Sequence, residues 1–230
     1  MKRLIVGAVW ALGLLFAAPA LAAPSTPATI GFSIGGDAMT LPVPAGMCLP
    51  APDQTALAQK LAASIPDTVT YVTLFDCSEK AAGGVPARIL MVVAPTKLGI
   101  QRMDRATVLG SLGSISDKSW ANAVNSPEVE AAQRKGAASM AGGEVLKDAK
   151  FDATLRPVDR DDLGFYLAGA VTVQVAGVTV TVPLAEAITS VNGHVVMLVA
   201  YGHGDGIAAI RTQASLVKAA NKAMIQASEK

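Results

Sequence analysis

Hydrophobic and polar residues alternate most regularly in residues 163–201. Valines and polar residues take turns in residues 171–175 and again in residues 178–182, with Ala176-Gly177 between the two runs. A period of two is typical of strands that bury one face. Asn192-Gly193 is a strong hairpin-turn signal, and a further apolar run follows it. The pattern predicts three antiparallel strands in a meander.

Two more hairpins are predicted before the meander. Short apolar runs at residues 30–34 and 38–43 flank Gly35-Gly36-Asp37, and glycine accepts the positive φ that tight turns need. Residues 69–77 are rich in β-branched side chains, and residues 87–94 are almost continuously apolar. We expect both to be strands, with residues 87–94 buried at the centre of the sheet.

Four segments carry the residue pattern of helices. Asp53 is placed to cap a helix over residues 54–64, and Asp104 is placed to cap the next one. Ser126-Pro127-Glu128 has the residue types of a helix start and predicts a surface helix to about Met140. The closing helix carries a mostly apolar stripe at three- and four-residue spacing: Ile207, Ile210, Ala214, Val217, Asn221 and Met224.

This order of elements, ββ-α-ββ-αα-βββ-α, predicts the α+β class. We expect an antiparallel sheet of about five to seven strands that ends in the meander and is covered by helices. Residues 30–230 would form one domain, with a flexible leader over residues 23–29 before it and a helical insertion around residues 119–150. The charged residues 159–162 before the meander are expected to form a solvated turn.

The first 22 residues have the pattern of a secretory signal peptide. Lys2 and Arg3 precede an apolar run over residues 4–16, Pro19 ends it, and Ala20-Leu21-Ala22 places small residues where signal peptidase cleaves. We expect cleavage after Ala22 and a periplasmic or secreted protein; the alternative is an uncleaved membrane anchor. No later stretch has the roughly 20 apolar residues of a membrane span, so we expect a soluble mature chain without one.

Composition and charge exclude several classes of protein. Apolar residues make up 51% of the chain and charged residues 16%, which excludes intrinsic disorder. The chain has 19 Lys and Arg residues and 18 Asp and Glu residues. Loss of Lys2 and Arg3 with the signal peptide would leave 17 basic and 18 acidic residues. Such a balance argues against a nucleic-acid partner, which would need a basic surface.

Cys48 and Cys77 are the two cysteines of the sequence. In an oxidising compartment such a pair most often forms a disulfide, and closing a loop of about 30 residues would contribute roughly 3–4 kcal/mol in the chain-entropy model. The alternative is a reactive thiol or a metal ligand, although neither cysteine has a CxxC partner or a histidine close in sequence. We expect the disulfide.

Two short motifs for serine chemistry are present. Gly31-Phe32-Ser33-Ile34-Gly35 matches the nucleophile elbow G-x-S-x-G, and Ser215-Leu216-Val217-Lys218 matches S-x-x-K. The first lies in a predicted hairpin instead of a strand–turn–helix unit, and the second lies within a predicted helix and lacks its partner motifs. We expect chance matches and assign no catalytic residue, no cofactor and no metal site.

His194 and His203 are the two histidines, and they flank one predicted strand. A straight strand would separate them by about 30 Å, so they cannot share a site. Tyr201, His203 and Asp205 lie together at the end of this strand. We expect Asp205 to cap the closing helix and His203 to be solvated; the alternative is that the three residues form a candidate ligand loop.

The mature chain resembles the Mog1/PsbP-like α/β/α sandwiches and, more closely, uncharacterised exported proteins of alphaproteobacteria. The resemblance is carried by Leu41-Pro42-Val43-Pro44-Ala45-Gly46-Met47-Cys48 after a short hairpin, by Phe75-Asp76-Cys77 at a strand end, and by the last strand, Gly/Asp turn and helix. It covers most of the mature chain as an order of elements, and residues 119–150 have no counterpart. The resemblance implies a binding or assembly accessory and transfers no functional residue.

These observations predict an exported, soluble, non-catalytic binding or accessory module of the cell envelope. Its partner would be a protein or a small-molecule ligand in that compartment. The alternative is a serine- or histidine-dependent hydrolase centred on Ser33 or on the loop with His203 and Asp205.

Overall fold

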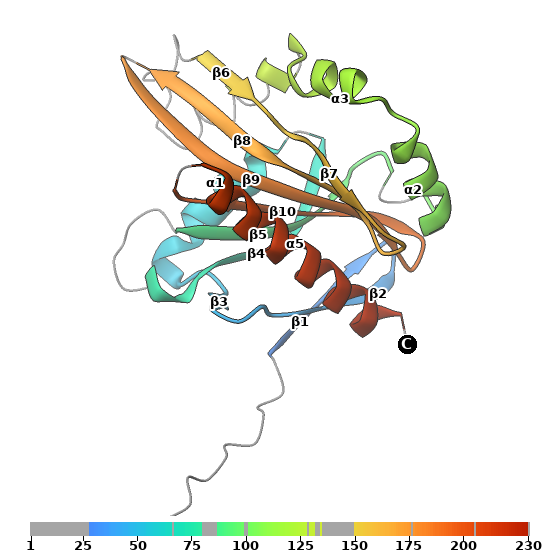
Figure 1. The fold of residues 1–230 in the computed structure, drawn as a ribbon. Coiled ribbons are helices and arrows are strands. Elements are labelled where there is room, and N and C mark those ends of the chain that lie inside the picture. The colour runs from blue at the N-terminus through green and yellow to red at the C-terminus, as the bar shows by residue number, and fades with distance from the viewer. Residues whose placement is uncertain are drawn as a thin grey trace, which may run out of the picture.

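The computed structural model describes residues 28–65, 67–79, 87–98, 101–127, 129–131, 134, 150–175, 177–204 and 206–229. Within them the predicted α+β class is confirmed, because an antiparallel sheet is covered by helices (Figure 1). The predicted signal peptide lies outside the described residues. So does most of the predicted leader, whose last residue, Thr29, already belongs to the first strand.

The elements follow one another in nearly the predicted order. The strands are β1 (Thr29–Ile34), β2 (Asp37–Pro42), β3 (Met47–Cys48), β4 (Thr68–Asp76), β5 (Arg88–Pro95), β6 (Lys150–Ala153), β7 (Arg156–Arg160), β8 (Phe165–Val175), β9 (Val178–Val191) and β10 (His194–Gly202). The helices are α1 (Thr55–Ser64), α2 (Arg105–Gly113), α3 (Asp117–Val124) and α5 (Gly206–Ser228), with short 3₁₀ turns η1 (Pro52–Gln54) and η2 (Cys77–Glu79).

The main sheet has more strands than predicted. Its order is β3-β4-β5-β10-β9-β8-β6, and β7 also pairs with β8, which makes eight strands among the described residues. The β1–β2 hairpin forms a separate two-stranded sheet. The prediction of a solvated turn over residues 159–162 is wrong in part, because Asp159 and Arg160 end β7 and pair with Tyr166 and Phe165.

The predicted meander is confirmed by strands β8, β9 and β10. Strands β8 and β9 pair from Phe165 opposite Ile188 to Val175 opposite Val178. The β9–β10 turn is made by Asn192-Gly193, with φ of 51° and 83°. Strand β5 lies between β4 and β10, and its six inner residues are buried, as expected for a central strand.

Helix α5 and the β1–β2 hairpin cover one face of the main sheet (Figure 1). Val217, Ala220 and Met224 of α5 pack there against alternate residues of the sheet, such as Leu198 and Tyr166. The apolar stripe predicted for the closing helix is therefore largely confirmed. Its first position is wrong: Ile207 is 67% exposed, because the first turn of α5 extends beyond the packed face.

Helices α1 and α2 cover the opposite face of the main sheet. Leu61 of α1 belongs to one apolar cluster with Met91 and Val199, and this cluster is called the α1 cluster below. Val108 and Leu109 of α2 belong to a second one, the α2 cluster, with Phe165, Leu167, Ile188 and Val195. The molecule is therefore a three-layer sandwich, with the sheet between the two sets of helices.

Of the two predicted helix-capping residues, one caps its helix and the other does not. Asp104 caps α2, since its carboxylate accepts a hydrogen bond from the N–H of Thr107 at 2.8 Å. Asp53 does not cap α1, because it lies inside the turn η1 that Pro52 begins. The Gln54 side chain instead accepts a hydrogen bond from the N–H of Ala51 at 3.1 Å. Most of the helix predicted for residues 126–140 lies outside the described residues.

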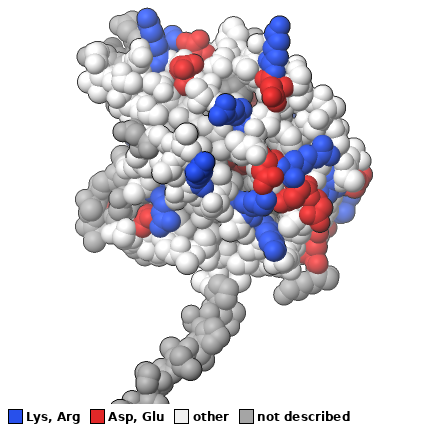
Figure 2. All heavy atoms as spheres, viewed as in Figure 1, with Lys and Arg blue, Asp and Glu red and all other residues white. Residues whose placement is uncertain are grey.

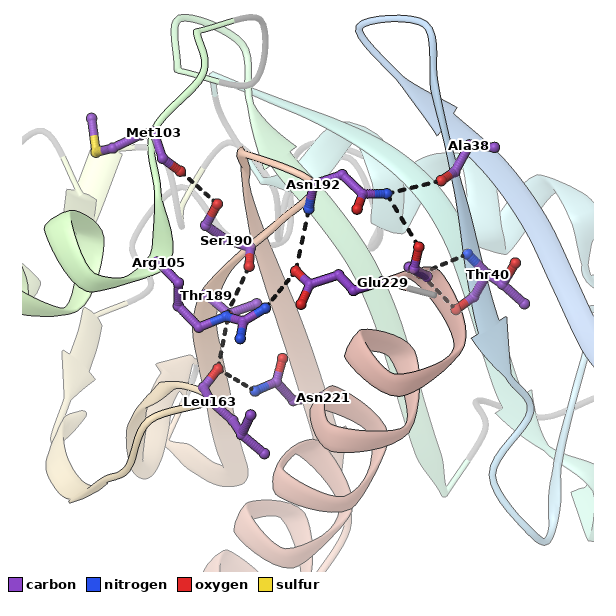
Figure 3. A network of polar contacts seen from close by, with 11 residues as sticks. Ala38, Thr40, Met103, Arg105, Leu163, Thr189, Ser190, Asn192, Asn221 and Glu229 are labelled. Atoms are coloured by element: carbon purple, nitrogen blue, oxygen red, sulfur yellow. Dashed lines mark hydrogen bonds and ion pairs between the residues drawn. The ribbon is translucent and has the colours of Figure 1, made fainter.

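A polar network fixes the C-terminal end of α5 (Figure 3). Arg105 at the start of α2 donates a hydrogen bond to the carbonyl of Ser190 at 3.0 Å and forms an ion pair with Glu229. Asn192 in the β9–β10 turn donates a hydrogen bond to the carbonyl of Ala38 at 3.2 Å. The network thereby joins α2, the end of β9, the β1–β2 hairpin and the last helix.

Charged side chains of both signs are mixed on the α5 face. Figure 2 shows Lys and Arg side chains beside Asp and Glu side chains, without a large area of one sign. On this face Lys218 of α5 lies 2.6 Å from Asp159 and 3.1 Å from Asp161. In the described part of the chain, none of the helices has the length and apolar character needed to cross a membrane.

Candidate functional site

The disulfide between Cys48 and Cys77 closes one end of the main sheet. The two cysteines are 29 residues apart in sequence, and their Cα atoms are 5.1 Å apart. The predicted pair thus lies at disulfide distance, and it joins β3 to the end of β4. Strand β3 pairs with β4 only through Met47 opposite Asp76 and Cys48 opposite Phe75. The bond holds a very short edge strand in place.

Asp76 supports the same corner of the sheet. Its carboxylate accepts hydrogen bonds from the N–H and the hydroxyl of Ser78, at 3.0 and 2.7 Å, and lies 2.6 Å from Nε of Arg88. These contacts, those of Ser78 first, lower the pKa of Asp76 to about 2. The carboxylate is charged and fully engaged near neutral pH, so its role is structural.

An open groove lies between α1 and the outer edge of β4. Its volume is about 390 Å³. Its wall on the helix side is one face of α1, and its other side is formed by four consecutive residues of β4. None of the residues that line it is charged: Leu49, Pro50, Thr55, Ala58, Gln59, Ala62, Thr70, Tyr71, Val72 and Thr73.

The part of β4 that lines the groove has no strand hydrogen-bonded to its outer side among the described residues, although the ring of Phe32 in β1 lies 5.7 Å from that of Tyr71. Strand β3 ends at Cys48, opposite Phe75, whereas β5 accompanies β4 on the inner side. The register shifts between Thr70 and Val72, which makes Tyr71 a bulge residue. The hydroxyl of Thr70 is buried and has no hydrogen-bond partner. The outer backbone groups of such an edge can pair with another strand.

A second polar group without a partner lies on the face of the sheet that carries α1 and α2. Glu186 occupies the middle of β9, opposite Leu167 of β8 and Val199 of β10. Within the described residues its carboxylate has no hydrogen bond or ion pair, and burial raises its pKa to about 7. Tyr201 lies on the same face, opposite Leu184; burial first, and then the charge of Glu186, raise the pKa of its phenol.

The three residues of the predicted ligand loop have different surroundings. Tyr201 is partly buried against the α1 cluster. His203 is exposed just beyond the end of β10, and Asp205 lies outside the described residues. His194 and His203 lie at the two ends of β10, as expected from their spacing. Ligand binding by this loop stays a prediction.

The serine and histidine considered for hydrolysis do not meet. Ser33 pairs with Ala38 on the exposed face of the β1–β2 hairpin. Asp37 lies on the other face, where its carboxylate is 2.8 Å from Nε2 of His194 and also pairs with Arg102. Because His194 is buried, this contact fastens the hairpin to the main sheet. It does not form a triad with Ser33.

The S-x-x-K match is explained by the surface of α5. Ser215 is exposed within α5. Lys218 is held by Asp159 and Asp161, and its hydrogen bonds to these two carboxylates raise the pKa of the ammonium. An ammonium so stabilised does not act as a general base at neutral pH.

Comparisons with known proteins were made at the level of families, single proteins and solved structures. No family model matches the chain, and no curated protein matches it. Among solved structures, the solution structure of cyanobacterial PsbP (CyanoP) from Synechocystis sp. PCC 6803 is similar. The two are 12% identical, the match covers 94% of this chain and 98% of the other, and the TM-score is 0.35. The function has to be inferred from the residues of the chain itself.

Proposed function

We propose that the mature protein is an exported, non-catalytic accessory module that binds an extended segment of a partner protein along the edge of β4. The proposal rests on the groove between α1 and β4, where a strand edge faces an uncharged wall. Extended peptides that add a strand to a sheet gain main-chain hydrogen bonds, and adjacent pockets select their side chains.

The position of β3 supports an extended peptide as the occupant. Strand β3 already pairs with the last residues of the same edge, so a segment placed opposite Thr70–Thr73 would continue its line. The uncharged lining favours a segment with small, neutral side chains.

The bulge at Tyr71 limits how much of the edge can pair. Bulges and short edge strands are devices by which proteins avoid indiscriminate pairing between sheets. Here the bulge and the covering helix α1 leave a segment of only a few residues accessible, which favours one matched partner over general aggregation.

The place of action is the second part of the proposal. The amino-terminal pattern of residues 1–22 supports export with cleavage after Ala22, and the cysteine pair at disulfide distance supports an oxidising compartment. We place the protein in the periplasm or outside the cell, as one domain formed by residues 30–230.

Synthetic strand peptides test the binding mode. Capped six-residue peptides of alternating Thr and Val serve as probes, and the same peptide with a central proline, which removes a main-chain donor, serves as the control. We expect the first peptide to protect the amide hydrogens of residues 70–73 from exchange and the second to leave them unprotected. Binding without protection of β4 would contradict strand addition.

Two neighbouring variants on α1 locate the contact. Ala62 lines the groove, whereas Ala63 is exposed and lies outside the lining. We expect Ala62→Lys to weaken peptide binding at least about ten-fold, because the long charged side chain would occupy the groove. Ala63→Lys should leave the affinity unchanged. Equal effects of the two substitutions would place the peptide elsewhere.

A further inference from the structure

Glu186 places a carboxylate at the boundary of two apolar clusters. Its neighbours on the same face of the sheet divide between them: Leu184 and Val199 belong to the α1 cluster, and Leu167 and Ile188 to the α2 cluster. The side chain is neither fully buried nor exposed, so part of it is accessible to solvent.

Two further apolar residues border this position. Leu155, from the corner between β6 and β7, and Met197 of β10 each pack against both clusters. Gly169 of β8, opposite Leu184, has no side chain, and the backbone of Thr154 approaches it there: a Cβ atom at Gly169 would be 2.5 Å from the Thr154 carbonyl oxygen. The surroundings of Glu186 are therefore apolar on the strand sides and at this corner.

An unpaired carboxylate in such surroundings is costly. Partial loss of hydration destabilises the charged form unless a cation or hydrogen-bond donors replace the lost water. Within the described residues no Lys, Arg or His supplies that charge to Glu186. A ligand that suits this position would therefore combine a positive charge with an apolar part.

We propose that Glu186 and Tyr201 form a binding site for a small organic monocation with an apolar tail, of the alkylammonium class. Glu186 is the counter-ion, and the ring of Tyr201, on the adjacent strand of the same face, attracts the ammonium group. Leu155, Met197 and Leu184 provide apolar contact for the tail.

A metal ion fits this position less well than an organic cation. Calcium takes six to eight oxygen ligands, and magnesium takes six, of which one or two are protein carboxylates and the rest are waters or phosphate oxygens that apolar surroundings do not provide. The described residues contain no group of three or more His, Cys, Asp or Glu side chains that could hold a metal ion. The face of an aromatic ring is instead a recognised partner of quaternary ammonium groups.

This site is separate from the groove on β4. Strands β5 and β10 lie between β4 and β9 in the sheet. Failure of cation binding at Glu186 would therefore not contradict strand addition at residues 70–73, and the reverse also holds. The two experiments report on different residues.

Three six-carbon probes test the proposal on the mature protein by calorimetry: hexyltrimethylammonium, 1-hexanol and hexanoate. We expect the cation to bind at least about ten-fold more tightly than the alcohol, the anion to bind most weakly, and the cation to shift the ring signals of Tyr201 in NMR spectra. Equal affinity for cation and alcohol, or no binding of the cation, would overturn the proposal.

Variants with matched changes in charge complete the test. Glu186→Gln keeps the size of the side chain and should abolish the preference for the cation over the alcohol, while Tyr201→Leu should reduce it. Asp53→Asn removes one negative charge from an exposed turn and should leave the preference unchanged. A preference for the cation over the alcohol that survives Glu186→Gln would show that the carboxylate is not the counter-ion.

Discussion

At the scale of single residues, Asp76 and Glu186 show how opposite surroundings move a carboxyl pKa in opposite directions. Asp76 is buried with three polar contacts, and its pKa falls to about 2. Glu186 is surrounded by apolar side chains, and its pKa rises to about 7. Each pKa shift also makes the free energy of unfolding depend on pH, because the same group has an ordinary pKa in the unfolded chain.

Asp76→Asn should lower the stability of the protein near neutral pH. The folded pKa of about 2 lies below the ordinary value of 3.8, so the charged group contributes about 2 kcal/mol above that ordinary value. The contribution is lost as the pH falls through about 2. Urea denaturation should show the variant less stable at pH 7 and equal to the parent near pH 2. A difference that persists at pH 2 would contradict the ionic origin.

Glu186→Gln should act in the opposite direction and in a different pH range. Since the folded pKa of about 7 exceeds the ordinary value of 4.5, the parent protein loses stability as the pH rises from 4.5 to 7. Tyr201 is the titratable neighbour on the same face, and its pKa is raised, so it stays neutral in this range. We expect the variant to be more stable by about 3 kcal/mol at pH 8 and equal to the parent near pH 4.5, measured by urea denaturation. Equal stability at pH 8 would show that burial does not destabilise the charge.

At the scale of elements, the β1–β2 turn depends on how closely it approaches β10. Gly35 and Gly36 both have positive φ, 59° and 93°. A Cβ atom on Gly35 would lie 2.6 Å from Cε1 of His194, whereas one on Gly36 would meet nothing within 4 Å. Gly36→Ala should cost about 1 kcal/mol from backbone strain alone, and Gly35→Ala at least about 1 kcal/mol more. Equal melting temperatures for the two variants would contradict the close contact.

The edge of the sheet at β3 depends on the disulfide. The loop between Cys48 and Cys77 spans 29 residues, which corresponds to about 3–4 kcal/mol in the chain-entropy model. The double variant Cys48→Ser/Cys77→Ser should lose that much stability in urea denaturation, and amide hydrogens of β3 should exchange faster. Reduction of the parent should give the same loss. Thiol titration of unreduced, denatured protein that finds two free thiols would contradict the bond.

The elements that the sequence predicted well are those with a strong local signal. Alternating valines and Asn192-Gly193 define the meander, and the nearly continuous apolar run defines β5. Strands β6 and β7 were missed because they are short edge segments, and Pro157 in β7 is a residue that argues against a strand. Their pairing with β8 is decided by tertiary contacts that no local pattern reveals.

The candidate sites were harder to predict than the fold. The groove joins residues 49–62 to residues 70–73 across a sheet edge, and a sequence does not show which edge stays unpaired. The sequence did point to Glu186. It is the charged residue in an otherwise apolar part of β9, and Leu184 and Ile188, two positions before and after it, lie on the same face of the strand. A charged residue on an otherwise apolar face of a strand is therefore a candidate functional residue.

At the scale of the whole molecule, the two proposed sites and the polar network lie at different places on the sheet. Helix α5 and the hairpin cover one face, and the network of Figure 3 joins them to the start of α2 on the other face. The groove lies at the β4 edge, and Glu186 lies on the face that carries α1 and α2. Variants at either site can therefore be made without disturbing the ion pair of Arg105 and Glu229.

Export is the prediction that concerns the whole chain. Expressed from its own start in a Gram-negative host, the protein should lose residues 1–22, because Ala20 and Ala22 present small side chains at the positions that signal peptidase reads. Mass spectrometry of the periplasmic fraction should find a chain that begins at Ala23. Replacing Ala20 and Ala22 by Leu should leave the precursor uncleaved, whereas Ala18→Leu, outside those positions, should be processed normally. Purified protein that retains Met1 and carries both cysteines reduced would contradict export, and with it the compartment in which the proposed partner segment is to be sought.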